Sequence, residues 1–239
     1  TGWTDLQGNF WIFGGDGGGV SFSDLMMYNP VTDEWTWVAG TGLANQPGNW
    51  GTKGVPSPNN YPSSRTYGVR SWTDHNGDLW LLGGYGYDAN GSNGDLNDLW
   101  RYNIATNEWT WMAGNNTVNA NGVYGTLQVP DVNNTPGARH ECTAAWTDLS
   151  GNLWCYGGYN FSQAFCDMWK FDVSINEWVW MSGSSGSLNP SYGVQGIPSA
   201  SNTPGSRLAY SHSTDVNGNF WLFGGANYNI TPYADLWKY

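Results

Sequence analysis

One apolar phrase recurs four times along the chain. It reads GNFWIFGG at 8–15, GDLWLLGG at 77–84, GNLWCYGG at 151–158 and GNFWLFGG at 218–225. Each copy has four apolar residues in a row, and a strand that is apolar on both sides is covered on both sides, as in a stack of sheets. Internal repetition at intervals of roughly 70 residues indicates a solenoid, a propeller or an array of repeats.

Three further segments of each repeat have the pattern of short strands. In the second repeat they are 68–74, 98–102 and 109–112, and the last of these alternates between tryptophan and other residues with a period of two. Between the first two strands of a repeat, sequences such as Asp-Leu-Ser-Gly-Asn from Asp148 are typical of tight hairpin turns. No stretch of ten or more residues has the apolar period of a helix. The pattern therefore predicts an all-β chain built from the four-stranded antiparallel blades of a β-propeller.

The spacing of a double glycine, an aromatic residue and a tryptophan in each repeat resembles the kelch motif. The residues that carry the resemblance are Gly14, Gly15, Tyr28 and Trp35 in the first repeat, Gly83, Gly84, Tyr102 and Trp109 in the second, Gly157, Gly158, Phe171 and Trp178 in the third, and Gly224, Gly225 and Tyr239 in the fourth. The resemblance covers essentially the whole chain. It implies a kelch-type β-propeller, similar to the central domain of galactose-oxidase-like proteins and to secreted bacterial repeat proteins.

The tryptophans fit this assignment. All of the 17 except Trp50 fall at repeated strand positions. At those positions they are expected to fill the space between neighbouring blades.

The repeats divide residues 1–239, as a single propeller segment, into four blades. We expect a first blade at 1–40 that lacks most of its inner strand, complete blades at 65–114 and 139–183, and a last blade at 207–239 that lacks its outer strand. A propeller closes with about four to eight blades. About three and a half blades predict an incomplete ring, completed by further blades of a parent chain or by self-association, because open edges and blade faces favour both. The first residue, Thr1, also suggests a processed piece.

Three long loops connect the blades, at 41–64, 115–138 and 184–206. Successive antiparallel strands alternate in direction, so these loops share one side of the blades with the turns that follow second strands. We call it the long-loop side. Loops of this length are usually functional or disordered. Each contains an aromatic–glycine step and a proline, and an arginine follows it at the entry of the next blade; these arginines are Arg65, Arg139 and Arg207.

Two interpretations of the long loops are open. In the structural one, the aromatic residue fixes the loop while the arginine bonds loop carbonyls or pairs with a repeated acid such as Asp98 or Glu108. In the functional one, the aromatic residues stack on sugars or on peptide side chains, and those that do not repeat closely are the better candidates for specificity. The candidate ligand-face residues are Trp50, Tyr124 and Tyr192 from the long loops, with Tyr85, Tyr87, Tyr159, Tyr228 and Tyr233 from the turns after second strands.

Composition narrows the partners. The formal net charge is -11, with only eight Lys and Arg residues, and this balance repels phosphate backbones. No apolar stretch approaches the roughly 20 residues needed to span a bilayer. We therefore expect a protein or glycan partner, without nucleic-acid binding or membrane insertion. The acidic balance, low lysine content and Trp-rich, Asn-rich repeats favour an extracellular or cell-surface location.

Residues suited to catalysis or metal binding are scarce. His75, His140 and His212 stand at unmatched positions of the repeat, so we predict no catalytic, cofactor-binding or metal-binding residues. The stretch 88–95 has Asp and Asn oxygens reminiscent of a calcium loop, but its glycine is misplaced for an EF-hand and no Glu closes it. A polar turn is the favoured interpretation there, with calcium as the alternative.

Two kinds of covalent modification remain open. The three cysteines, Cys142, Cys155 and Cys166, all lie in the third repeat and allow ordinary buried thiols, one local disulfide or a metal site. Five sequons could accept glycans in a eukaryotic secretory pathway; they begin at Asn90, Asn115, Asn133, Asn160 and Asn229.

Three functions are compatible with the sequence. The favoured one is a non-enzymatic recognition or scaffold module that binds protein or glycan through the long-loop side. The second is a structural subunit of a surface filament or matrix, assembled through the apolar blade faces. The third, which the galactose-oxidase resemblance raises, is a fragment of a copper enzyme whose catalytic ligands lie elsewhere; fold alone does not carry that activity.

Overall fold

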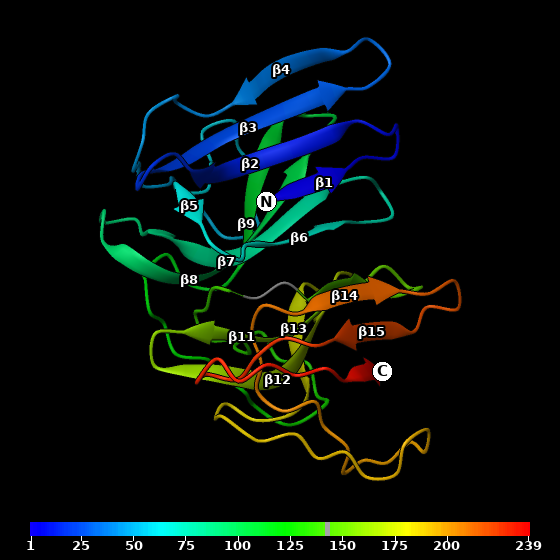
Figure 1. Ribbon diagram of the computed structural model, residues 1–239. Coiled ribbons are helices and arrows are strands. Elements are labelled where there is room, and N and C mark those ends of the chain that lie inside the picture. The colour runs from blue at the N-terminus through cyan, green and yellow to red at the C-terminus, as the bar shows by residue number, and fades with distance from the viewer. Residues whose placement is uncertain (142–143) are drawn as a thin grey trace. The chain divides into compact units, whose positions relative to one another are not determined.

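A computed structural model describes residues 1–141 and 144–239 of the chain. Within these ranges there are sixteen strands and no helix, which confirms the all-β prediction (Figure 1). The strands of the first half are β1 Gly2–Thr4, β2 Phe10–Asp16, β3 Ser21–Asn29, β4 Glu34–Ala39, β5 Arg65–Thr66, β6 Arg70–Thr73, β7 Leu79–Tyr87, β8 Asn93–Asn103 and β9 Glu108–Ala113. The others are β10 Ala145–Thr147, β11 Leu153–Asn160, β12 Gln163–Asp172, β13 Glu177–Ser182, β14 Ser211–Thr214, β15 Phe220–Phe223 and β16 Leu236–Lys238.

The strands form four antiparallel sheets, each with its strands in sequence order. The orders are β1-β2-β3-β4, β6-β7-β8-β9, β10-β11-β12-β13 and β14-β15-β16, and the short β5 pairs with the far end of β7. This is the strand order predicted for a propeller blade. The apolar phrase forms the second strand of each sheet, with a strand on either side.

The first blade corrects one expectation from the sequence. Its inner strand, β1, is present and has three residues, the same number as the inner strand β10 of the third blade. The prediction that this strand is mostly missing is therefore wrong. Trp3 pairs directly with Trp11, so even a short strand places a large apolar side chain in the core.

The double glycine produces a bulge in the second strand. The register between β7 and β8 shifts between Leu82 and Gly84, and the equivalent shift follows Phe13 in β2 and Tyr156 in β11. Gly83 has φ 63°, and a Cβ placed on it would lie 2.8 Å from the carbonyl oxygen of Leu96. Only glycine combines this backbone conformation with this close approach.

The chain consists of two compact units. The first comprises Thr1–Asn121 with Gly137–His140 and holds β1–β9; the second comprises Gly122–Pro136 with Glu141–Tyr239 and holds β10–β16. Each unit therefore stacks two blades around a core of its own. No helix in the part of the chain that the structure describes is both long and apolar enough to cross a membrane.

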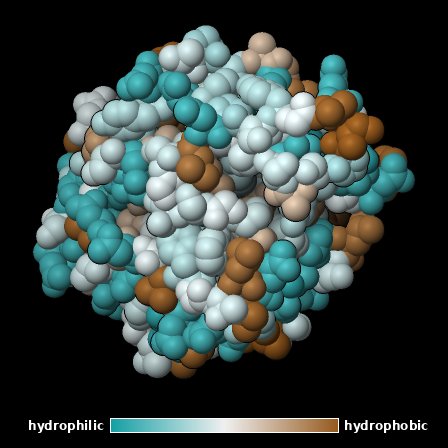
Figure 2. All heavy atoms as spheres, turned by 90° about the horizontal axis from the view of Figure 1, so that it is seen from below, coloured by the Kyte–Doolittle hydropathy of each residue, from teal (hydrophilic) through white to brown (hydrophobic). Residues whose placement is uncertain are grey.

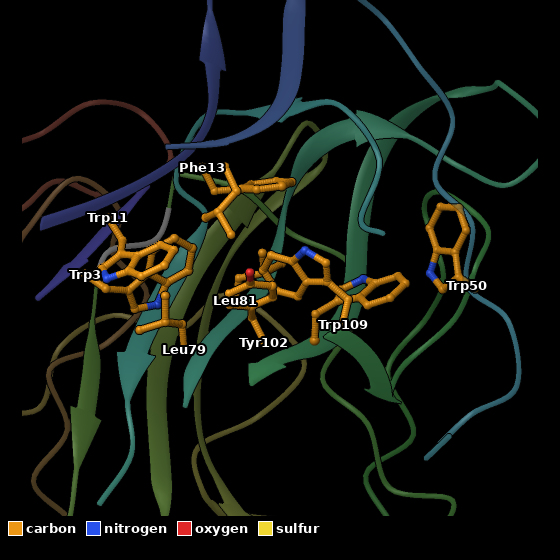
Figure 3. Close-up of a cluster of buried hydrophobic side chains, with 10 residues drawn as sticks. Trp3, Trp11, Phe13, Trp50, Leu79, Leu81, Tyr102 and Trp109 are labelled. Atoms are coloured by element: carbon orange, nitrogen blue, oxygen red, sulfur yellow. The ribbon is translucent and has the colours of Figure 1, made fainter. Parts of the chain in front are cut away.

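The core of the first unit is a layer of aromatic and aliphatic side chains between its two blades. The first blade contributes Trp3, Trp11 and Phe13, and the second contributes Tyr102 and Trp109. In Figure 3, Trp3 and Trp11 lie beside each other, and Phe13 reaches toward Trp109, with ring centroids 5.6 Å apart. Trp3, Trp11 and Trp109 thus fill the space between blades, as predicted, whereas Trp35 and Trp37 of the first blade are more than half exposed.

An aspartate in the turn before each second strand fixes that turn. The indole N–H groups of Trp11, Trp80, Trp154 and Trp221 donate to Asp5, Asp74, Asp148 and Asp215 over 2.8, 2.8, 2.8 and 3.0 Å. We call these four aspartates the turn aspartates. Burial acts to raise the pKa of Asp148, but hydrogen bonds from Trp154 and Asn152 outweigh it and hold that pKa below its usual value.

Candidate functional site

The aromatic residues of the long loops each pack onto a tryptophan of a blade. Trp50 is only 3% exposed, and its ring lies 5.8 Å from that of Trp100, centroid to centroid. Its placement among ligand-face residues is therefore corrected: a ring buried against a strand cannot stack on a ligand. The Trp50 indole N–H finds no hydrogen-bond partner among the described residues.

Tyr124 and Tyr192 occupy the equivalent places in the other two loops. Tyr124 lies 5.0 Å from the Trp169 ring and donates its hydroxyl hydrogen bond to Asp167 over 2.6 Å. Tyr192 stacks on Trp237 at 5.4 Å and donates to Asp235 over 3.0 Å. These contacts are the ones that the structural interpretation of the loops requires.

The arginines at the blade entries make the partner contacts of the same interpretation. Arg65 is completely buried and forms a two-pronged ion pair with Asp98, each N–H···O distance being 2.8 Å. It also donates to the carbonyl oxygens of Ser63 and Gly83. Arg207 binds Asp235 in the same way over 2.8 and 3.0 Å. Arg139 is buried and donates its Nε–H to Gly137.

The remaining candidates lie at the ends of second strands or in the segments that follow them, and they are not equivalent to one another. Tyr233 lies over the Arg207 guanidinium at 4.6 Å, which ties it to the blade entry. Tyr85 is half-buried between Tyr67 and His140, at ring distances of 6.4 and 5.8 Å. Tyr87 is half-buried at the end of β7.

Tyr159 and Tyr228 form an exposed group together with Phe161, a residue that the sequence did not single out. The Tyr159 ring lies 5.7 Å from Tyr228 and 6.1 Å from Phe161. Phe161 is 63% exposed and Tyr228 is 43% exposed. We call these three residues the aromatic cluster. It lies within the second unit on its long-loop side: Tyr159 is near the end of β11, Phe161 is in the β11–β12 turn, and Tyr228 is in the segment after β15.

The position of Phe161 gave a signal that sequence reasoning missed. It follows Asn160 in a two-residue turn between β11 and β12, and the Asn160 side chain accepts the backbone N–H groups of Ser162 and Gln163. At the tip of this turn the Phe161 ring contacts Tyr159 of β11 and remains 63% exposed. An apolar residue in an otherwise polar hairpin turn is therefore a sequence sign of a surface anchor.

A shallow hollow adjoins the aromatic cluster. It has a volume of about 170 Å³ and is lined by Tyr228 together with amide and hydroxyl side chains from Ser187, Asn189, Ser206, Asn227 and Asn229, and by Leu188. Its lining carries no charged side chain. A flat aromatic ring beside neutral donors and acceptors suits a ligand with both apolar faces and hydroxyl groups.

A larger hollow, of about 480 Å³, lies in the first unit on the side opposite the long loops. Trp11, Met27 and Trp37 line it together with the polar side chains of Gln7 and Asn107. This hollow is open to solvent. The carboxylate of Asp5, which also lines it, accepts hydrogen bonds from Gln7, Asn9 and Trp11 within the turn that it stabilises. The groups facing this hollow thus serve the fold.

The carboxylates and histidines that could bind a metal ion make contacts within the fold. The carboxylate of Asp88 accepts the backbone N–H groups of Asn90 and Ser92 over 2.8 and 2.9 Å, so it caps the polar turn of the stretch 88–95. Among the described residues, no group of three His, Cys, Asp or Glu side chains could hold a metal ion. His140 binds Asp95 within the first unit, and burial lowers the pKa of His212.

Cys155 and Cys166 are buried, and Cys142 lies outside the described residues. The asparagines of four sequons are exposed, while Asn160 is half-buried; the exposed ones are Asn90, Asn115, Asn133 and Asn229.

Hydrophobic side chains reach the surface in several separate groups among hydrophilic ones on the face drawn in Figure 2. Exposure alone therefore does not identify a binding surface on this chain. The aromatic cluster is distinguished by ring-to-ring contact between residues at non-repeated positions and by the adjoining polar hollow.

Comparison with known proteins points to one family. The family model described as "Kelch motif" matches residues 6–39, which span the second to fourth strands of the first blade, and residues 149–179, which span the second and third strands of the third blade and the start of its fourth. A search of curated proteins finds none that matches the chain.

Proposed function

The chain belongs to the kelch-repeat β-propeller family, and from this premise we propose that it is a non-enzymatic recognition module that binds a partner protein through the long-loop side of its second unit. Kelch blades are typically scaffolds for protein interactions. The binding residues are those that the scaffold does not itself use.

The observation that carries the proposal is the aromatic cluster. Phe161 and Tyr228 expose large parts of their rings while their mutual contacts with Tyr159 hold them in place. Rigid aromatic residues that need little further ordering are typical anchors of protein interfaces. By contrast, Trp50 and Tyr124 are committed to packing on the blades.

The composition of the chain supports a proposal about its cellular location. We propose an extracellular or cell-surface setting, supported by the net charge of -11 and the small number of lysines. Exposed sequon asparagines are compatible with glycosylation if the source has that pathway. Detection of the protein in the medium or on intact cells, by surface biotinylation, tests this part.

Site-specific photo-crosslinking tests the recognition surface. Benzoylphenylalanine placed at position 161 or 228 is expected to capture the same partner protein from the native source. The same group at Val216, which is 98% exposed in the turn after β14 on the opposite side, is expected to capture nothing in common. Equal capture at all three positions, or different products at 161 and 228, would refute the proposal.

A neutral glycan is a second candidate ligand, favoured by the amide and hydroxyl lining of the hollow beside Tyr228. An array of neutral and acidic glycans distinguishes the two. Binding of a neutral glycan that is lost in Tyr228→Ala and kept in Val216→Ala would favour the glycan over the protein.

A further inference from the structure

The hollow beside the aromatic cluster contains side chains whose hydrogen-bonding polarity is fixed by the fold. The side-chain oxygen of Asn227 accepts the backbone N–H of Thr231 over 3.0 Å, which leaves its amide N–H groups for a ligand. The hydroxyl oxygen of Ser206 accepts the backbone N–H of Leu188 over 2.8 Å, which leaves its hydroxyl hydrogen. Both residues line the hollow, so each brings a hydrogen-bond donor to it.

The other polar side chains of the hollow keep donors in excess. Asn189 and Asn229 line it with two further amides, each of which has two N–H donors and one acceptor oxygen. Ser187 brings an acceptor, because its hydroxyl donates to the carbonyl oxygen of Ala164 over 2.9 Å. The hollow is therefore best matched by a ligand that is rich in hydrogen-bond acceptors.

The size and charge of the hollow restrict what such a ligand can be. A volume of about 170 Å³ is below the roughly 300–1,000 Å³ of sites that enclose a whole small molecule, so it accommodates part of a longer ligand. A charged group of the ligand would lose water there without meeting an opposite charge, which is unfavourable. The part of the ligand that enters the hollow is therefore neutral.

The backbone beside the hollow does not offer a sheet edge to a partner strand. The N–H groups of Ala226, Asn227 and Ile230 donate to the carbonyl oxygens of Leu208, Thr231 and Asn227. Strand addition needs a row of free N–H and C=O groups along one edge. Recognition at this place therefore depends on side chains.

A proline-rich segment matches these conditions. Proline has no N–H, and the carbonyl oxygens of a polyproline II helix make no internal hydrogen bonds, so such a segment offers acceptors alone. Aromatic rings with polar neighbours are also the surfaces on which proline-rich segments dock. Here Tyr159, Phe161 and Tyr228 provide the rings, and the amides beside Tyr228 provide the donors.

We propose that the partner protein presents an uncharged, proline-rich segment in the polyproline II conformation to this site. Its proline rings pack on Phe161 and Tyr228, and its carbonyl oxygens accept hydrogen bonds from Asn227 and Ser206. The inference rests on the proposed recognition function and specifies the partner. Because a proline-rich chain already populates the bound conformation, it loses little conformational entropy on binding.

Reversing the polarity of one side chain tests the hydrogen bonds. In Asn227→Asp the carboxylate can still accept the Thr231 N–H, so the turn is kept while the donor to the ligand is lost. Asn176→Asp is the matched control, in the β12–β13 turn on the side opposite the long loops. Asn176 has φ 58°, and Asp33 holds the same place in the first blade with φ 59°, so the fold accommodates aspartate there.

Fluorescence anisotropy of a labelled peptide of ten prolines is the measurement. The unmodified chain is expected to bind it saturably with a Kd of about 1 mM or tighter, and a glycine–serine peptide of equal length about tenfold or more weakly. Tyr228→Ala is expected to raise the Kd about tenfold or more, and Asn227→Asp about fivefold. Asn176→Asp is expected to leave it unchanged. Near-ultraviolet circular dichroism checks the folding of each variant, and Tyr228→Ala alone decides if Asn227→Asp does not fold.

Three results would overturn the inference. The first is no saturable binding of the proline peptide, and the second is equal affinity for the glycine–serine peptide. The third is unchanged or tighter ligand binding in a folded Asn227→Asp variant, which is what a hydroxyl-bearing ligand would give, since hydroxyl groups donate to a carboxylate. Photo-crosslinking at positions 161 and 228 separates the two proposals. Capture of a partner without binding of the proline peptide overturns this inference alone, whereas failure of capture overturns the recognition function itself.

Discussion

The ion pair between Arg65 and Asp98 offers the sharpest test of how the blades are held. Replacing Arg65 by Met keeps an unbranched apolar stem, although a shorter one, and removes all of the side-chain hydrogen bonds of Arg65. Both partners are completely buried, so the Asp98 carboxylate would remain inside the protein, where the Trp100 indole N–H donates to it over 2.7 Å. Breaking a buried ion pair in this way costs about 3–5 kcal/mol.

That cost is a large part of the stability of a typical domain, which is about 5–15 kcal/mol. With a urea m-value of about 2–3 kcal/mol/M, it lowers the unfolding midpoint by roughly 1–2 M. Urea unfolding followed by tryptophan fluorescence measures the loss, and hydrogen exchange in β7 and β8 assigns it to the second blade. Arg101→Met is the matched control, because Arg101 lies in β8, is 32% exposed and sits 3.7 Å from Asp78. A partly exposed pair of this kind contributes about 1 kcal/mol or less.

The double variant Arg65→Met with Asp98→Asn separates the buried charge from lost packing. The amide that replaces the carboxylate would keep an oxygen for the Trp100 N–H and would remove the unpaired charge, so we expect it to recover roughly half of the loss. A loss below about 1 kcal/mol in Arg65→Met, or a double variant no more stable than the single one, would refute the reasoning.

Three other measurements examine the loops, the turns and the bulges. Tyr124→Phe is expected to lower the free energy of unfolding by about 1–2 kcal/mol, because it removes a 2.6 Å hydrogen bond to a carboxylate. Tyr192→Phe is expected to lower it by less than half as much, since Tyr192 is 53% exposed and its hydrogen bond is 3.0 Å long. Equal losses of the two variants in urea unfolding would contradict this difference. Hydrogen bonds hold the pKa of Asp148 below its usual value, so the stabilisation that they give is present above about pH 4 and is lost as the pH falls through the lowered pKa. The urea midpoint should therefore fall with pH in that acid range, and less steeply in Asp148→Asn. The same pH dependence of the midpoint in both proteins would count against this prediction. Gly83→Ala is expected to lower the free energy of unfolding by at least about 2 kcal/mol, and Gly91→Ala by about 1 kcal/mol. Both residues have positive φ, but only at Gly83 would the new Cβ lie against a backbone oxygen. Thermal unfolding compares the two variants, and equal losses of stability would contradict the prediction.

The sequence predicted the elements that repeat, because repetition exposes them. The double glycine marks the bulge of each second strand. The tryptophans mark the layers between blades, and the pattern around Asp148 marks a tight turn. Each of these follows from local backbone geometry or from the period of the side chains, which a single sequence displays directly.

The sequence did not predict burial at positions whose environment comes from distant segments. Trp50 and Tyr228 are both aromatic residues in loops, yet the first is covered by Trp100 and the second is open to solvent. Which of them is buried depends on the path of a long loop over the next blade, and no local pattern encodes that path. The inner strand of the first blade was predicted to be mostly missing for a related reason, since the extent of so short a strand is defined by its pairing with β2.

The structure also explains why the search for function leads away from the repeated residues. Many of the polar groups that recur with the blades already have an internal partner: the turn aspartates accept from tryptophans, Arg65 binds Asp98, and the loop tyrosine Tyr124 binds Asp167. A ligand that used any of these groups would have to break a contact on which a blade depends. Phe161 and Tyr228 contact each other and Tyr159, in segments that differ from blade to blade. Recognition can therefore vary at these positions without cost to the fold, which makes the aromatic cluster the place where selection for a partner would act.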